Sequence, residues 1–295
     1  MSKQAMSAAP GEYGEIFDRG YRHYDGPRLG QAQAIWALAR YSMARALGMR
    51  RPWTAKIIPM LLYAAVAIPV LIAIGIRAFF PAFVFLRYPE FFGAIFLLVG
   101  IFVALIAPEM MSSDRHDRLL PLYFSRPIGR STYVLAKLLA TGLLTLSMSL
   151  LPAVVLWLGN GLLASEPLSA LRASLGDLGR IIVAGTMIAF YLGAIGLLIS
   201  SFTGRKSVAV GVIILGFVLS ESLSVAILQA FRDRPDLARW SMVVSPSRTI
   251  ATMVGQLFGE PDLGSDVPLN VALGVMAAVI AICCGVMFAW YQRRD

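Results

Sequence analysis

Histidine and cysteine, the side chains that most often bind metals or act in nucleophilic catalysis, are scarce in this sequence. The histidines are His23 and His116, and both lie in polar segments. The cysteines, Cys283 and Cys284, are adjacent within an apolar run, a spacing that gives neither a disulfide framework nor a zinc site. No Ser-His pair can be assembled within an apolar segment. We therefore predict no catalytic residue and no metal site.

A phosphate-binding loop is also missing from the sequence. The pattern G-x-x-x-x-G-K-[ST] surrounds the phosphates of a nucleotide with backbone N–H groups and a lysine. The nearest match, GRKS at 204–207, lacks both the upstream glycine and the Gly-Lys pair. We predict that the chain binds no cofactor and does not hydrolyse ATP by itself.

A dense group of charged side chains follows Glu109. One turn of mixed charge precedes an apolar run: Asp114, Arg115, Asp117 and Arg118, then Leu119, Leu120, Leu122, Tyr123 and Phe124. We expect a short helix that begins at Ser112, Ser113 or Asp114 as its N-cap, with a charged side available to a soluble partner. A solvated loop is the alternative, but it does not explain the apolar run.

The composition shows what must position these residues. Of 295 residues, 58% are hydrophobic and only 15% are charged, against about 25% charged in a soluble domain, and the mean hydropathy is +0.71. The chain cannot supply a polar shell, so it is predicted to be an integral membrane protein. Its net charge of +9 would suggest nucleic acid in a soluble chain, but here the distribution of the bases decides.

Six apolar stretches are long enough to cross a bilayer as helices, which takes about 20 residues each. We place them at 57–79, 91–110, 134–158, 178–201, 207–230 and 270–291, with a tight turn at 202–206. With both termini in the cytoplasm, inner segments carry 18 of the 26 Lys and Arg residues and outer segments carry eight. This bias supports an orientation with both termini in the cytoplasm, and we predict that the protein lies in the inner membrane of a cell. The bias also explains the net positive charge without a nucleic-acid partner.

The whole chain is predicted to consist of three parts. Residues 1–29 form a polar N-terminal tail, residues 30–56 a cytoplasmic interfacial helix, and residues 57–295 the six-span domain. The apolar side chains of 31–53 cover about half of a helix circumference, which is typical of a helix lying on a membrane surface. An ordinary helix packed on a partner is the alternative. After Ser245 and Pro246 a further helix is expected in the outer segment 231–269, either re-entrant or capping the outer face.

Two spans carry unusual residues. Glu221 lies within the fifth hydrophobic span of the predicted series, where a carboxylate is costly unless it faces the bundle interior or a wet cavity. It either lines a pathway or is a hydrogen-bonded structural residue. In the span before it, Gly185, Ala189 and Gly193 recur every four residues on one face, a spacing that lets two membrane helices approach closely.

The segment 107–140 resembles a known family. Glu109 at the end of the second span, the turn DRHDR at 114–118, LPLYFSRP at 120–127 and YVLAK at 133–137 are similar to the permeases of type-2 ATP-binding-cassette (ABC) exporters. The similarity extends to the whole plan: an inner N-terminal helix, six spans, an inner helix between spans two and three, and a long outer connection between spans five and six.

This resemblance implies an all-α membrane protein with six transmembrane helices. It implies that a coupling helix at about 114–124, with Glu109, Asp114, Arg115, Asp117, Arg118, Leu119 and Tyr123, docks into a separate ABC ATPase subunit. Two ATPase copies, which hold the ATP and Mg, would drive two permeases, the second expected to be a copy of this chain. The alternatives are an intramembrane enzyme using Glu221 and a membrane anchor or scaffold that transports nothing.

The orientation can be tested by labelling single cysteines in a variant that lacks Cys283 and Cys284. A cysteine at Arg205 should be protected from an impermeant thiol reagent in intact cells, whereas a cysteine at Glu166 should react, because the 18 to 8 bias places them on opposite sides. Both should react in permeabilised cells. Labelling at Arg205 in intact cells would show that the orientation is wrong.

Overall fold

The computed structural model describes residues 30–49, 52–81, 83, 85–117, 123, 128–260 and 267–293, and every regular element in these ranges is helical. Six helices of 25 to 33 residues are long and apolar enough to span a membrane. They are α2 (Thr54–Phe79), α3 (Tyr88–His116), α5 (Arg130–Leu162), α7 (Leu175–Phe202), α8 (Lys206–Ala230) and α11 (Leu269–Arg293). The prediction of an all-α protein with six spans is confirmed.

The remaining elements are short. They are α1 (Gln31–Ala46), α6 (Pro167–Ala173), α9 (Pro235–Ala238), the 3-10 helix η1 (Arg239–Val243) and α10 (Pro246–Phe258). The helix expected after Ser245 is confirmed as α10, with Pro246 at its first position, where its missing N–H costs nothing. The tight turn at 202–206 is also confirmed, since α7 ends at Phe202 and α8 begins at Lys206.

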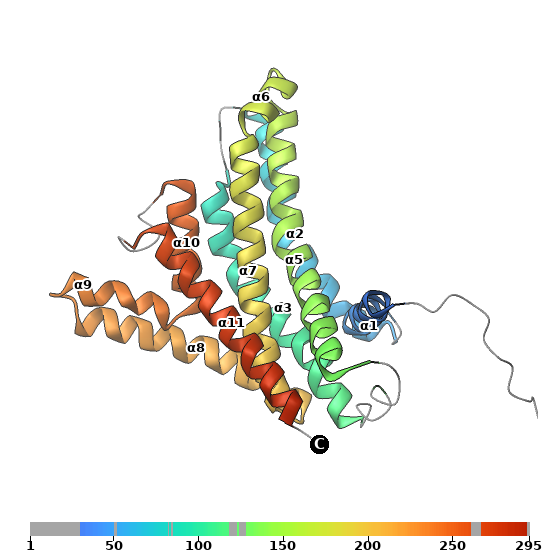
Figure 1. The fold of residues 1–295 in the computed structure, drawn as a ribbon. Coiled ribbons are helices and arrows are strands. Elements are labelled where there is room, and N and C mark those ends of the chain that lie inside the picture. The colour runs from blue at the N-terminus through green and yellow to red at the C-terminus, as the bar shows by residue number, and fades with distance from the viewer. Residues whose placement is uncertain are drawn as a thin grey trace, which may run out of the picture.

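The bundle is built around α3 and α7, the two spans with the largest buried fraction (Figure 1). Their neighbour α5 packs along α7, and α1 lies across the end of the bundle near the C-terminus, against α5 and α3. Figure 1 shows α8 leaving the bundle obliquely, with α9 at its far end. Whether α1 rests on a membrane surface stays a prediction, because no membrane is present.

The second span differs from its predicted course. It was expected to end near Pro108 and Glu109, with a new helix capped at residues 112–114, but α3 continues without a break to His116. The reason is that these polar side chains find partners on other helices and do not cap a helix start. The hydroxyl of Ser112 donates to the backbone oxygen of Ser200 on α7 at 3.0 Å. Residues 118–122 and 124 of the predicted coupling helix, and the tail 1–29, lie outside the described residues.

Small residues set the distances between the central helices. The hydroxyl of Ser149 on α5 donates to the backbone oxygen of Gly185 on α7 at 2.9 Å, and a Cβ at Gly185 would lie 3.1 Å from Leu150. Ala189 and Gly193 are fully or nearly fully buried on the same helix. On the side of α7 that meets α3, a Cβ at Gly196 would lie only 2.3 Å from Cγ1 of Val103. Backbone contact of this kind replaces side-chain interdigitation in membrane helix pairs.

Gly196→Ala should destabilise the bundle by about 1–3 kcal/mol, because the added methyl group overlaps Val103 and forces α3 and α7 apart. Gly211→Ala on α8 is the matched control, since nothing lies within 4 Å of a Cβ there. In the control, the better helix propensity of Ala should leave stability equal or higher. Thermal unfolding in detergent measures both. Equal midpoints for the two variants would contradict the close approach at Gly196.

Candidate functional site

Three carboxylates at the C-terminal end of α3 converge on one arginine of α1. The guanidinium of Arg45 donates to Asp114 at 2.8 Å and to Asp117 at 2.9 Å, and its Nε lies 3.3 Å from Glu109. A guanidinium presents five N–H groups in a fixed fork, so it can engage several carboxylates at once. Arg45 therefore fixes α1 to the last turns of α3.

Asp114 is the most deeply buried member of this group, with no exposed side-chain surface. Besides Arg45, it binds two residues of α5. The ammonium of Lys137 lies 2.6 Å from its Oδ2, and the hydroxyl of Tyr133 donates to the same oxygen at 3.0 Å. Lys137 is itself 2% exposed and also donates to the hydroxyl of Ser42 on α1 at 2.9 Å. The carboxylate thus joins α1, α3 and α5.

Glu109 extends the network to a fourth helix. Its side chain is 3% exposed, and its Oε2 accepts a hydrogen bond from Lys206 at 2.6 Å. Lys206 is the first residue of α8, so this ion pair ties the start of α8 to α3. We call the six residues of this cluster the charge network: Arg45, Glu109, Asp114, Asp117, Lys137 and Lys206.

The charge network balances three cations against three carboxylates. Burying an isolated charge costs several kcal/mol, and a buried pair is tolerated only when its geometry is good and its remaining polar atoms are satisfied. Removing one partner leaves an uncompensated charge and is strongly destabilising. The network therefore fixes the relative positions of four helices at this end of the bundle.

The two members outside the spans have shifted pKa values. Burial by itself lowers the pKa of Arg45, but the nearby carboxylates of Asp114 and Glu109 outweigh it and raise the pKa above its ordinary value. A hydrogen bond with His116, supported by Arg45, lowers the pKa of Asp117. Asp117 therefore stabilises the fold above its ordinary pKa, and this contribution is lost as the pH falls through the lowered value.

The other predicted coupling residues are dispersed. Arg115 binds a different helix from Asp114, since its side chain donates to the backbone oxygen of Ser201 on α7. The ring of Tyr123 lies 5.8 Å from that of Tyr133, and burial followed by the charge of Asp114 raises the pKa of Tyr123 to about 12. Arg118 and Leu119 lie outside the described residues. The structure thus brings Glu109, Asp114 and Asp117 together, while Arg115 contacts another helix.

A cleft lies beside the exposed face of this region. It has a volume of about 700 Å³ and lies between the end of α3 and the turn that joins α7 to α8. Seven of the eight residues that line it have polar side chains: Ser112, Ser113, His116, Asp117, Arg205, Lys206 and Ser207, with Val210 as the eighth. The charge network and the cleft share Asp117 and Lys206, so any molecule that enters the cleft touches the network.

Glu221 lies in a separate polar cluster, between α8 and α10. It accepts hydrogen bonds from Ser245 and Ser247, and Nε of Arg248 lies 3.6 Å from its Oε1. The side chain of Glu221 is 43% exposed. These contacts attach the far half of α8 to the start of α10. That Glu221 lines a pathway stays a prediction.

A sequence model of the ABC-2 family transporter proteins matches residues 84–290, which make up more than two thirds of the chain. The chain belongs to the ABC-2 transporter family. As a permease of this family, it is the membrane component of a transporter, and membership implies an ABC ATPase as its partner. No curated protein matches the sequence. The matched region begins just before α3 and leaves α1 and α2 outside it, so Arg45 binds from outside the matched region to carboxylates within it.

The sequence alone did not identify three residues of the permease's charge network: Arg45, Lys137 and Lys206. Lys137 stood in the YVLAK segment that carried the family resemblance, and its place early in an apolar span was a signal that it needs a partner.

Within the described ranges, no three His, Cys, Asp or Glu side chains are grouped to hold a metal ion.

Asp114→Asn should destabilise the permease by about 3–5 kcal/mol, because it leaves Arg45 and Lys137 facing each other without their shared carboxylate. The matched control is Asp117→Asn, whose side chain is 47% exposed, and which should cost no more than about 1 kcal/mol. Adding Lys137→Met to Asp114→Asn should recover part of the loss. Thermal unfolding in detergent gives all three values. Equal losses from the two Asn variants would contradict the central place of Asp114.

Proposed function

We propose that this permease is half of the transport pathway of an ATP-driven exporter, coupled to a separate ATPase subunit through the segment that follows α3. Two ATPase subunits, which bind ATP and Mg, act on a pair of permeases, and the second permease is a copy of this chain. The complex lies in the inner membrane with both termini in the cytoplasm.

The observation that carries this proposal is the charge network. A force applied at the end of α3 moves α1, α5 and α8 with it, because Asp114 binds α1 and α5, and Glu109 binds α1 and α8. A coupling device needs this property, since a push on a loosely held loop would be absorbed locally. Packed helices respond to such a push by shifting between discrete arrangements.

The partner's contact is proposed at the segment beyond Asp117 and at the adjoining cleft. The exposed charged side chains there are Asp117, Arg205 and Lys206, and the exposed His116 lies beside them. Arg118, which follows directly in the chain, is proposed to face the same partner. When ATP binding closes the ATPase pair, the inner ends of the helices would move as one unit and shift the permeases from an inward-open to an outward-open state.

The two alternatives gain less support. An intramembrane enzyme would need catalytic partners for Glu221, and its neighbours Ser245, Ser247 and Arg248 form a hydrogen-bonded cluster without a histidine. A passive anchor would leave the cost of burying Glu109, Asp114 and Lys137 at one end of the bundle without a purpose. Rigid coupling supplies that purpose.

Arg118→Glu combined with Arg205→Glu should reduce co-purification of the partner ATPase by at least several-fold, because reversed charges repel their complement across an interface. The partner is sought first among ABC ATPases encoded by adjoining genes. The control is Arg172→Glu with Arg232→Glu, which reverses two exposed arginines elsewhere on the chain.

Both double variants should reach the membrane in normal amounts and should unfold at the parent's midpoint. If the Arg118/Arg205 double variant co-purifies as much ATPase as the parent, the proposed contact is wrong. Equal loss in both variants would show that the effect is one of overall charge and not of this surface.

A further inference from the structure

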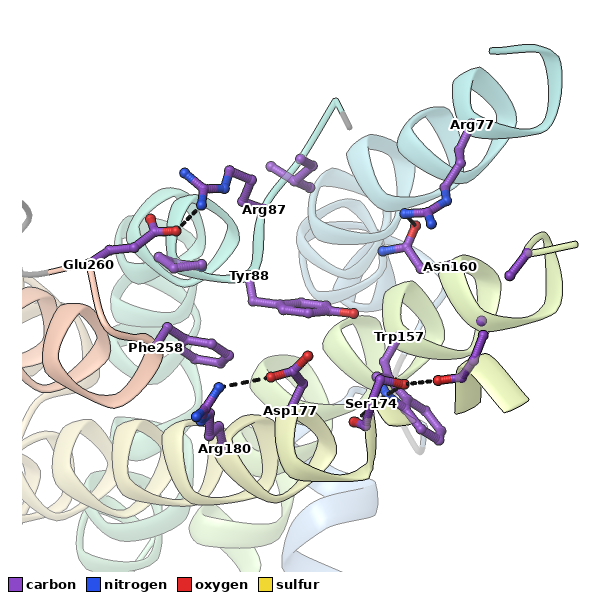
Figure 2. A pocket seen from close by; sticks show the side chains of 15 residues that line it. Arg77, Arg87, Tyr88, Trp157, Asn160, Ser174, Asp177, Arg180, Phe258 and Glu260 are labelled. Atoms are coloured by element: carbon purple, nitrogen blue, oxygen red, sulfur yellow. Dashed lines mark hydrogen bonds and ion pairs between the residues drawn. The ribbon is translucent and has the colours of Figure 1, made fainter. Parts of the chain in front are cut away.

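A second polar cavity lies at the opposite end of the bundle from the charge network. It has a volume of about 340 Å³, is partly open, and is lined by the ends of α2, α3, α5, α7 and α10 and by α6 (Figure 2). Pockets of about 300–1,000 Å³ are typical of small-molecule sites. None of the network residues lines this cavity, so it needs its own explanation.

Two of the three arginines in the cavity wall are paired with carboxylates. Arg180 binds Asp177 at 3.0 Å on α7, and Arg87 binds Glu260 at the far side (Figure 2). Arg77, in the last turn of α2, is half-buried and donates to the neutral side-chain oxygen of Asn160 at 3.2 Å. Within the described part of the chain, Arg77 has no acidic partner, so these charged residues of the wall carry a net charge of +1.

The rest of the wall is shaped by aromatic rings. Figure 2 shows the ring of Tyr88 extending across the cavity, between Asn160 on one side and Asp177 on the other. The ring of Tyr88 packs against the ring of Phe258, with 5.8 Å between the two ring centroids. Trp157 is held in place because its indole N–H donates to the backbone oxygen and the hydroxyl of Ser174, at 3.1 and 3.0 Å. A ligand of this cavity would meet both guanidinium groups and aromatic rings.

These features select a particular chemistry. A single negative charge balances the excess, and a guanidinium fork binds oxyanions through two parallel hydrogen bonds. A phosphodiester carries one negative charge and has more acceptor oxygens than a carboxylate, so it offers more hydrogen-bond acceptors to the arginines of the wall. Rings beside the anion suit an apolar substituent.

We propose that this cavity binds a phosphodiester anion with uncharged substituents, held by Arg77 and packed against Tyr88 and Phe258. Two sources present this group: the headgroup of an anionic lipid, such as phosphatidylglycerol, and a small soluble phosphodiester. Arg77 lies two residues before the end of a span, which is the depth at which lipid phosphates meet a helix. The proposal does not depend on the ATPase partner.

The test titrates the purified full-length chain in detergent with three probes and follows the thermal unfolding midpoint, which a ligand of the folded state raises. The probes are dioleoylphosphatidylglycerol, dioleoylphosphatidylcholine and soluble glycerophosphoglycerol. The variants are Arg77→Gln, Arg77→Lys and the control Arg172→Gln on α6, which does not line the cavity. Each midpoint shift is taken relative to the same variant without a probe, so a change in basal stability cancels. Native mass spectrometry counts the lipids retained.

We expect phosphatidylglycerol to bind the parent at least tenfold more tightly than phosphatidylcholine, whose choline adds a cation beside Arg77. Arg77→Gln should weaken this binding at least tenfold, Arg77→Lys should weaken it less, and Arg172→Gln should leave it unchanged. If the soluble phosphodiester fails to bind, the ligand is a lipid; if it binds through Arg77 as well or alone, the headgroup is sufficient. Equal binding by the parent and Arg77→Gln, equal binding of the two lipids, or no binding of any probe would overturn the proposal.

Discussion

The carboxylate of Asp114 is removed from water and held between the guanidinium of Arg45, the ammonium of Lys137 and the hydroxyl of Tyr133. Its ionic charge can be tolerated there only while these partners stay in place. The positions of α1, α3 and α5 are therefore not independent. Because Glu109 binds both Arg45 and Lys206, the start of α8 is fixed by the same requirement. The opposite end of the bundle, with its open cavity and partly exposed ion pairs, is under no such constraint.

The length of the apolar stretches was enough to predict the six spans, because a bilayer of fixed thickness makes this signal strong. The Ser245-Pro246 pair was enough to predict the start of the helix after it. The course of α3 could not be predicted, since Pro108 and the Ser-Ser-Asp sequence at 112–114 are the usual signs of a helix boundary. Those signs were overruled by tertiary contacts with α5, α7 and α1. The role of Arg45 was equally hidden, because its partner Asp114 lies 69 residues away. Local pattern carries no information about pairings over such a separation.

The helix α8 differs from α3 and α7 in that little of its surface is buried within the chain. It has few buried side chains, and its exposed ones are large and apolar, including Val208, Leu215, Leu219 and Leu223. In a membrane, side chains of this kind can face lipid at no cost. Polar contacts hold the helix through Lys206 and Glu109 at its start. Near its far end, Glu221 binds Ser245, and the hydroxyl of Ser224 donates to the backbone oxygen of Ser241. The helix is thus attached near both ends, while most of its surface between these attachments is not covered by the other helices of the chain.

The order of residues along the chain has a consequence for biogenesis. Arg45 leaves the ribosome before either buried carboxylate, whereas Lys137 and Lys206 follow later, Lys206 a full 97 residues after Glu109. During membrane insertion α3 therefore arrives with its acidic end before two of its three cations exist. In that interval Arg45 on α1 is the cation present in the chain that binds both Glu109 and Asp114 in the folded structure. The N-terminal helix would then serve the nascent protein as a built-in insertion aid, in addition to its place in the finished bundle.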